Sequence, residues 1–404
     1  MILYMRKLKV TKEISKRIED NFKLKEVITT KEKEIYEFLL QNINNGNEYF
    51  LKEKKNHKIQ TGLKTLIVDK SHKERYDLVG GRFLPEHIKT NIENKITHIL
   101  RYSTQIGSHK VLLEFGILDE DELTDIDKYE DYTEWIFTWL HFCFTHTGNS
   151  CVETLNIKIY LSSINKVLPG NKTKVLGPSE INTGYTYHCK ENNEIVIFRS
   201  EEWMKVLLHE TMHCFGFDMS SHDMLIKNTL KKYFPIKSEF LLSESYAEFW
   251  ARTLNIVFYN YFLHKKRINS KRILEDIKYG LEIEKYYSIY QSSKILDYMS
   301  LGYDDIVCNS EKNICLRQNL YRERTNVFSY YILTSILFFD YESVLIFFKK
   351  SNKHLLKFHS NRENIVYFLK MIIKRSRNKK YRTQIYKSRN MLNKYDDSLR
   401  MSAF

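Results

Sequence analysis

Glycine and proline are scarce in this sequence, which has only 13 glycines and 4 prolines among its 404 residues. The many tight turns of an all-β sandwich or barrel draw on both residue types. Their scarcity argues against such a fold and favours a helix-rich chain. A hydrophobic content of 43% and a charged content of 28% suit a protein with a sizeable buried core and exclude global disorder.

Paired cysteines and long apolar runs are missing as well. The six cysteines include no Cys-x-x-Cys pair, and six cysteines in a chain of this length do not indicate a disulfide framework. We therefore expect free thiols under reducing conditions. Residues 1–10 lack the apolar stretch of a signal peptide. The longest apolar run, residues 327–339, is interrupted by Ser, Tyr and Thr and is too short to span a bilayer. We therefore expect a soluble, intracellular protein without a membrane span.

Acidic residues are outnumbered by basic ones, and the formal net charge is +14. The excess is greatest near the C-terminus, at residues 372–389. A basic balance favours an acidic partner, and we predict weak nucleic-acid contact through a basic tail at residues 372–404. The alternative is a coding bias, because Lys, Asn, Ile and Tyr are all abundant, as in AT-rich genomes of large DNA viruses and some microbes.

The hydrophobic pattern changes along the chain. Lys-rich residues without a motif come first, alternating strand-like segments follow, and helical periodicity dominates after about residue 240. The strand candidates are residues 96–104, 109–117, 155–162, 183–188 and 194–200. We predict an α+β fold in four parts: an N-terminal region of unknown role (1–94), a catalytic core (95–260), a helical C-terminal subdomain (261–371) and the basic tail (372–404).

Residues 201–215 are predicted to form a helix that carries an HExxH motif, HETMH, at 209–213. Residues four apart share a helix face, so His209 and His213 can bind one ion. Zinc accepts neutral His nitrogens, and catalytic zinc sites keep one position open for water. Glu210 can reach that water as a general base. The alternative is a helix with two structural histidines, but a predicted strand and a plausible N-cap at Ser200 before the motif favour the metal site.

A third ligand is expected from residues 241–250, LLSESYAEFW, where Glu244 and Glu248 lie one helical turn apart. With this pair the sequence resembles the gluzincin group of zinc peptidases, which includes the relatives of thermolysin. The resemblance implies that Glu244 binds the metal and that Glu248 orients a ligand His through its free ring N–H. It extends from the strand before the HExxH helix to Trp250, and it departs from the family at Ser243, where Asn is frequent. A solvated helix face is the alternative interpretation.

The resemblance also implies a fold and an activity. It implies a zincin-like fold, with a twisted mixed sheet over the HExxH helix and a mainly helical C-terminal part. The implied activity is zinc-dependent hydrolysis of a peptide or protein substrate. Gluzincins bind extended substrates along an edge strand, so Gly184, Tyr185 and Tyr187 are the substrate-binding candidates. An ordinary core strand or loop is the alternative for this segment.

An oxyanion needs a hydrogen-bond donor besides the metal. By the same resemblance, Tyr330 and Tyr331 on a predicted helix are the candidates. The alternative is a core role for both, since the chain contains 28 tyrosines.

Two further alternatives stay open. In a metzincin the glycine of HExxHxxGxxH would be Gly216, but the position of the third His is Met219, with Asp218 and His222 close to it. The second alternative is a catalytically idle zincin-fold binding protein, associated with nucleic acid through the basic tail. Retention of Glu210 favours the enzyme over the idle protein.

Overall fold

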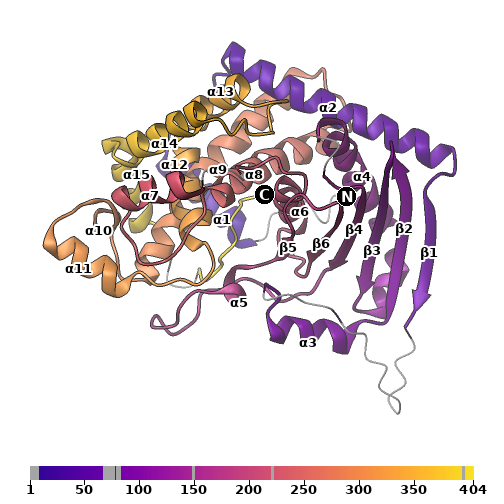
Figure 1. Cartoon of the computed structure of the whole chain (residues 1–404), viewed down its shortest axis with the longest axis horizontal. Helices are drawn as coiled ribbons and strands as arrows, with labels where there is room; N and C mark the ends of the chain where they lie inside the picture. Colours follow the sequence, from indigo (N-terminus) through magenta and orange to yellow (C-terminus); the bar gives the residue numbers. More distant parts are fainter. Residues whose placement is uncertain (1–8, 67–77, 79–82, 148–150, 220–222, 394–395) are drawn as a thin grey trace.

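A six-stranded sheet forms one side of the molecule, and most helices pack together on the other side (Figure 1). The computed structural model describes residues 9–66, 78, 83–147, 151–219, 223–393 and 396–404. Its elements in chain order are α1 (Lys9–Asn21), α2 (Thr30–Lys55), β1 (Gln60–Thr65), α3 (Glu86–Lys95), β2 (His98–Ile106), β3 (His109–Ile117), η1 (Glu120–Asp125), α4 (Asp127–His146), β4 (Thr154–Tyr160), α5 (Pro178–Ile181), β5 (Gly184–Thr186), β6 (Asn192–Ile197), α6 (Trp203–Cys214), α7 (Asp223–Tyr233), α8 (Leu242–Leu263), α9 (Lys271–Tyr298), α10 (Tyr303–Val307), α11 (Glu311–Leu320), η2 (Phe328–Leu333), α12 (Thr334–Phe339), α13 (Tyr341–Ser351), α14 (Arg362–Ser376) and α15 (Lys379–Asn390).

The strands follow the order β1-β2-β3-β4-β6-β5. Strand β4 pairs in parallel with both β3 and β6, and the other neighbours pair antiparallel. In β4 the buried residues Leu155, Ile157 and Ile159 alternate with polar ones, which is the period of a strand. The sheet is mixed and the α+β fold is confirmed, and each predicted strand segment overlaps one of the strands β2 to β6.

Helix α6 lies on the same face of the sheet as α4. The two helices meet through the stacked rings of Trp135 and Trp203, and the Trp139 indole donates a hydrogen bond to the hydroxyl of Thr211 at 2.8 Å. A second apolar cluster, which includes Ile88 and Tyr185, lies apart from this core and joins α3 to β5 and β6. The position of α6 beside the edge strand β5 is therefore fixed by buried aromatic packing.

The start of α6 differs from the prediction. Ser200 was expected as the N-cap, but the helix begins at Trp203 after Glu202, whose φ of 60° is left-handed and whose side chain does not cap the helix. The buried Glu202 carboxylate instead pairs with Lys166 and accepts the main-chain N–H groups of Met401 and Ser402 at 3.0 and 2.6 Å. Burial of an ion pair, which the local sequence does not reveal, decides where this helix starts.

The C-terminal segment, predicted as part of a basic tail, is folded into the molecule. Residues 372–376 belong to α14, and α15 follows. The segment 396–404 then enters the interior between α6 and α9, and the chain ends near the centre of Figure 1. Leu399 and Ala403 are buried, and the main-chain N–H of Ala403 donates to the carboxylate of Glu284 at 2.9 Å.

The main hydrophobic core contains residues from all four predicted parts, from Ile14 to Ala403. Strand β1 of the N-terminal region pairs with β2, and α2 packs on α4. The predicted boundaries near residues 94, 260 and 371 stay predictions. The hydrophobic core continues across all three of them, and α8 and α14 run through residues 260 and 371.

The expectation of free thiols is wrong for one pair, because Cys151 and Cys189 form a disulfide. The two cysteines are 38 residues apart and come together only because β4 and β6 are neighbours, so no local spacing marks them. Within the described residues, no single helix is long and apolar enough to cross a membrane. The two helical segments Phe328–Phe339 and Tyr341–Ser351 together have the length and composition of a span, but they are bent by 92°.

Removal of residues 398–404 is expected to destabilise the fold. The carboxylates of Glu202 and Glu284 would lose their main-chain donors and the core would lose Leu399, Met401 and Ala403, at a cost of at least about 3 kcal/mol in the free energy of unfolding. Urea unfolding of the full and truncated chains measures this loss. Glu284→Gln in the truncated chain should recover part of it, because a neutral amide is cheaper to leave buried. Equal urea midpoints for the full and truncated chains would contradict this account.

Candidate functional site

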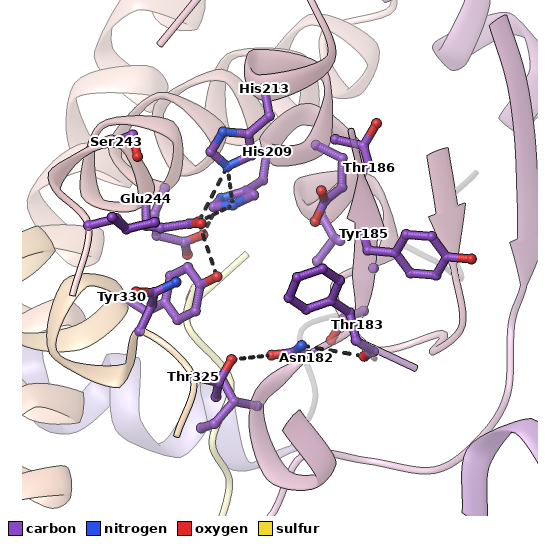
Figure 2. Close-up of a pocket in the computed structure, with 18 of the residues that line it drawn as sticks. Asn182, Thr183, Tyr185, Thr186, His209, His213, Ser243, Glu244, Thr325 and Tyr330 are labelled. Carbon is purple, nitrogen blue, oxygen red and sulfur yellow. Dashed lines mark hydrogen bonds and ion pairs between the residues drawn. The ribbon is translucent and has the colours of Figure 1, made fainter. Parts of the chain in front are cut away.

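A cavity of about 430 Å³ lies where β5, α6, α8 and η2 meet (Figure 2). Helices α6 and α8 pack directly against each other, and α6 also contacts β5. The residues of the HExxH motif that face the cavity are His209, Glu210 and His213, and Glu244 and Glu248 face it from α8. The structure therefore brings together all the residues predicted around the metal.

Three side-chain atoms meet in this cavity at nearly equal distances. The Nε2 atoms of His209 and His213 are 3.2 Å apart, and Glu244 Oε2 lies 3.2 Å from the first and 3.3 Å from the second. Tetrahedral coordination with bonds of about 2.0–2.1 Å places ligand atoms about 3.3–3.4 Å apart. The three atoms thus have the spacing of one face of a metal tetrahedron, and His209, His213 and Glu244 could hold a metal ion.

Each of the two imidazoles is held by a carboxylate on its other nitrogen. His209 Nδ1 lies 3.0 Å from Glu248 Oε2, and His213 Nδ1 lies 2.5 Å from Asp218 Oδ2. A carboxylate there favours a proton on Nδ1 and leaves the lone pair of Nε2 directed into the cavity. Both rings are therefore oriented with Nε2 toward the position that a metal ion would take.

Glu248 is itself fixed by two buried cations. Lys205 Nζ lies 3.0 and 3.2 Å from its two oxygens, and Arg252 Nε donates to it at 2.7 Å. Burial raises the pKa of the Glu248 carboxyl, but Lys205 and Arg252 outweigh burial and hold the pKa well below its ordinary value. The carboxylate stays ionised and can accept the N–H of His209.

Asp218 has a different position from the one considered in the metzincin alternative. Its second oxygen, Oδ1, lies 3.0 Å from His188 Nε2, so the carboxylate bridges two histidines behind the cavity instead of joining the ligand atoms. The metzincin alternative is wrong for Asp218, and its other candidate, His222, lies outside the described residues. The role of Asp218 was missed because nothing in the sequence after the motif distinguishes a residue that orients His213 from an ordinary turn residue.

Glu210 lies on the same helix turn as His209 and is 8% exposed. Burial raises the pKa of its carboxyl. In the part of the chain that the structure describes, no group forms a hydrogen bond with this carboxylate, and it does not belong to the group that could hold a metal. The Glu210 oxygens are therefore available to a molecule bound in the cavity.

The two predicted tyrosines point in different directions. Tyr330 faces the cavity from η2, a π-helical turn, and its hydroxyl donates to Glu244 Oε2 at 3.1 Å (Figure 2). The hydroxyl of Tyr331 donates instead to the carbonyl of Leu399 at 2.6 Å, and Tyr331 is 1% exposed. The prediction for Tyr331 is wrong, because neighbouring residues of a helical turn lie on different faces.

Strand β5 also separates the substrate-binding candidates. Tyr185 belongs to the cluster beneath α3, and its ring points away from the histidines although it borders the cavity (Figure 2). Tyr187 is 39% exposed, lies under Lys190 and does not line the cavity. The Tyr187 side chain therefore lies outside the cavity, just beyond the end of β5 and on the same side of the strand as Tyr185, and its role in substrate binding stays a prediction. Gly184 is the candidate that borders α6.

Gly184 permits the close approach of β5 to α6. A Cβ atom there would lie 2.9 Å from the Val196 carbonyl oxygen, 2.9 Å from Val206 Cγ1 and 3.4 Å from Glu210 Cγ. Real Cβ atoms are not found so close to a backbone oxygen. Any larger residue must therefore push the edge strand away from the helix that carries Glu210.

Comparisons with known proteins add no relative: no family model, curated protein or solved structure matches this chain.

Gly184→Ala is expected to lower the free energy of unfolding by about 1–3 kcal/mol through overpacking. Gly62→Ala is the matched control, because Gly62 lies in β1 at the opposite edge of the same sheet and its Cβ would meet no atom within 4 Å. Thermal and urea unfolding of both variants give the comparison. Equal stabilities for the two variants would refute the close-approach argument.

Asp218→Asn is expected to weaken binding of Zn²⁺, used as the test ion, about 10–100-fold, as changes to residues that orient metal ligands do. Competition with a chromogenic chelator measures the affinity. Asp20→Asn, at an exposed position in α1, should leave it unchanged. If Asp218→Asn stays folded by circular dichroism and binds Zn²⁺ as tightly as the unchanged protein, the assigned role of Asp218 is wrong.

Proposed function

We propose that this protein is a zinc-dependent peptidase with a zincin-like arrangement of sheet and active-site helix. The observation that carries the proposal is the triangle of His209, His213 and Glu244 atoms, in which a carboxylate stands behind each imidazole. Two nitrogens and one carboxylate oxygen in tetrahedral spacing, with space for a fourth ligand in the cavity, form a donor set typical of catalytic zinc.

When bound there, zinc would acidify a water molecule and polarise the carbonyl of a substrate. Glu210 would accept the proton of the attacking water, because its carboxylate is buried, has no hydrogen bond to any of the described residues and is adjacent to His209. The protonated Glu210 could then pass this proton to the leaving amine. Tyr330 would turn its hydroxyl from Glu244 toward the developing oxyanion.

The open edge of β5 is the proposed binding surface for an extended peptide. Phe198 N–H donates to the Thr183 carbonyl at 2.9 Å, and in an antiparallel ladder such bonded pairs alternate with unbonded ones. The main-chain groups of Thr183 and Tyr185 therefore face β6, and those of Gly184 and Thr186 face outward. A peptide could add one more strand there, beside the proposed metal and Glu210.

The proposed contact with nucleic acid has less support than the peptidase. Several basic groups of the predicted tail already have protein partners: the Arg375 guanidinium pairs with Asp340, and the Arg389 guanidinium pairs with Asp297. We therefore favour the enzyme over an idle binding protein. Nucleic-acid binding stays a prediction of the sequence.

Glu210→Gln is expected to keep fold and zinc content but to lower turnover about 10²–10⁴-fold, since the amide cannot accept a proton. Peptide cleavage is followed by mass spectrometry on a broad peptide mixture, and zinc is measured by elemental analysis. His209→Ala should lose both zinc and turnover. The exposed Glu191→Gln is the matched control and should lose neither. If Glu210→Gln cleaves as fast as the unchanged enzyme, Glu210 is not the base.

A further inference from the structure

One end of the proposed substrate groove is closed by a contact that crosses it. Thr325 Oγ1, from the segment before η2, donates to Asn182 Oδ1, from the segment before β5, at 2.9 Å (Figure 2). Behind this contact the main-chain N–H of Arg324 donates to the Leu176 carbonyl at 2.9 Å. Both residues of the first contact line the cavity, so together the two contacts form an end wall.

The wall lies close to the reacting groups. Gly184 borders Glu210, since a Cβ on Gly184 would lie 3.4 Å from Glu210 Cγ. Asn182, in the wall, is two residues before Gly184, which corresponds to about 7 Å along a strand. A peptide that follows β5 therefore has space for at most about two residues between the scissile bond and the wall.

The direction of the bound peptide decides which of its ends meets the wall. Strand β5 runs from the wall at Asn182 toward Thr186. Antiparallel pairing is the more frequent and the slightly more stable arrangement. An antiparallel peptide runs toward the wall, so its residues on the carboxyl side of the scissile bond face Asn182 and Thr325.

The wall also has a polar group that could receive a chain end. The hydroxyl of Thr183 is buried and without a hydrogen-bond partner among the described residues, and Thr183, which is 4% exposed, lines the cavity. A buried hydroxyl without a partner is costly. A terminal carboxylate brought to the wall would accept its hydrogen bond once the Thr183 side chain turns toward the cavity.

We infer that this protein removes short fragments, of one or two residues, from the carboxyl end of peptides. This inference rests on the proposed peptidase function and adds that the groove admits a free C-terminus and excludes the middle of a chain. Endopeptidase action would require the substrate to continue through the contact between Thr325 and Asn182.

The test compares three sets of decapeptides on the zinc-loaded full chain. The first set is acetylated at the amino end and free at the carboxyl end, the second is also amidated, and the third is extended by ten Gly and Ser residues beyond the same carboxyl end. Mass spectrometry identifies each product. We expect release of one or two C-terminal residues from the first set and at least about 100-fold slower cleavage at the same bond in the third. Amidation should slow cleavage to a smaller extent.

Variants of the wall show whether it is the cause. Thr325→Ala removes the side-chain contact of the wall and should speed cleavage of the extended peptides about tenfold, while the main-chain contact between Arg324 and Leu176 stays in place. Thr325→Ser keeps the hydroxyl and should retain the discrimination. Unchanged zinc affinity in both variants shows that the metal site is intact.

Three outcomes would overturn the inference. Cleavage of the extended peptides as fast as the free-ended ones would contradict end selection and leave the proposed peptidase standing. Release of one or two residues from the amino end instead of the carboxyl end would contradict the antiparallel orientation. If no peptide is cleaved by zinc-loaded protein, the proposed function itself fails, and the inference fails with it.

Discussion

The site depends above all on the buried carboxylate of Glu248 and the contacts that it makes. Its oxygens join a histidine and a lysine of α6 to an arginine of its own helix, so one buried group fixes the distance between the two helices that supply the candidate ligands. Burying a carboxylate is costly unless cations and hydrogen bonds surround it, and here they do. If Glu248 lost its charge, the buried cations Lys205 and Arg252 would lose the ion pairs that they form with it.

The same network reaches the C-terminal segment. Arg252 also lies 3.4 Å from Glu284, which in turn accepts hydrogen bonds from Ser402 and Ala403. Glu202, directly before α6, also contacts that segment. The orientation of His209 is thus linked, through buried ions alone, to residues almost two hundred positions further along the chain.

The sequence predicts the parts of this arrangement that depend on local periodicity. Spacing on one helix places His209 and His213 together, alternation identifies the strands, and the pair Glu244 and Glu248 defines a second helix that faces the first. The parts that depend on tertiary contact were not predictable. The disulfide of Cys151 and Cys189 and the buried C-terminal segment have no periodic pattern, since each meets its partner only after the sheet and helices have assembled. Asp218 is close to His213 in the chain, but it lies in an irregular turn after α6, where no periodicity predicts the direction of a side chain.

The buried position of residues 398–404 sets an order for biosynthesis. The main chain of this segment supplies donors for Glu202 and Glu284, so a nascent chain that still lacks it leaves these carboxylates without those hydrogen bonds, although Lys166 and Arg252 can already pair with them. Strands β2 and β3 pair within one hairpin and can form while the chain is still being synthesised. The bonds that link this network to the C-terminal segment form only after residues 401–403 have been synthesised, so the hairpin of the sheet can precede them.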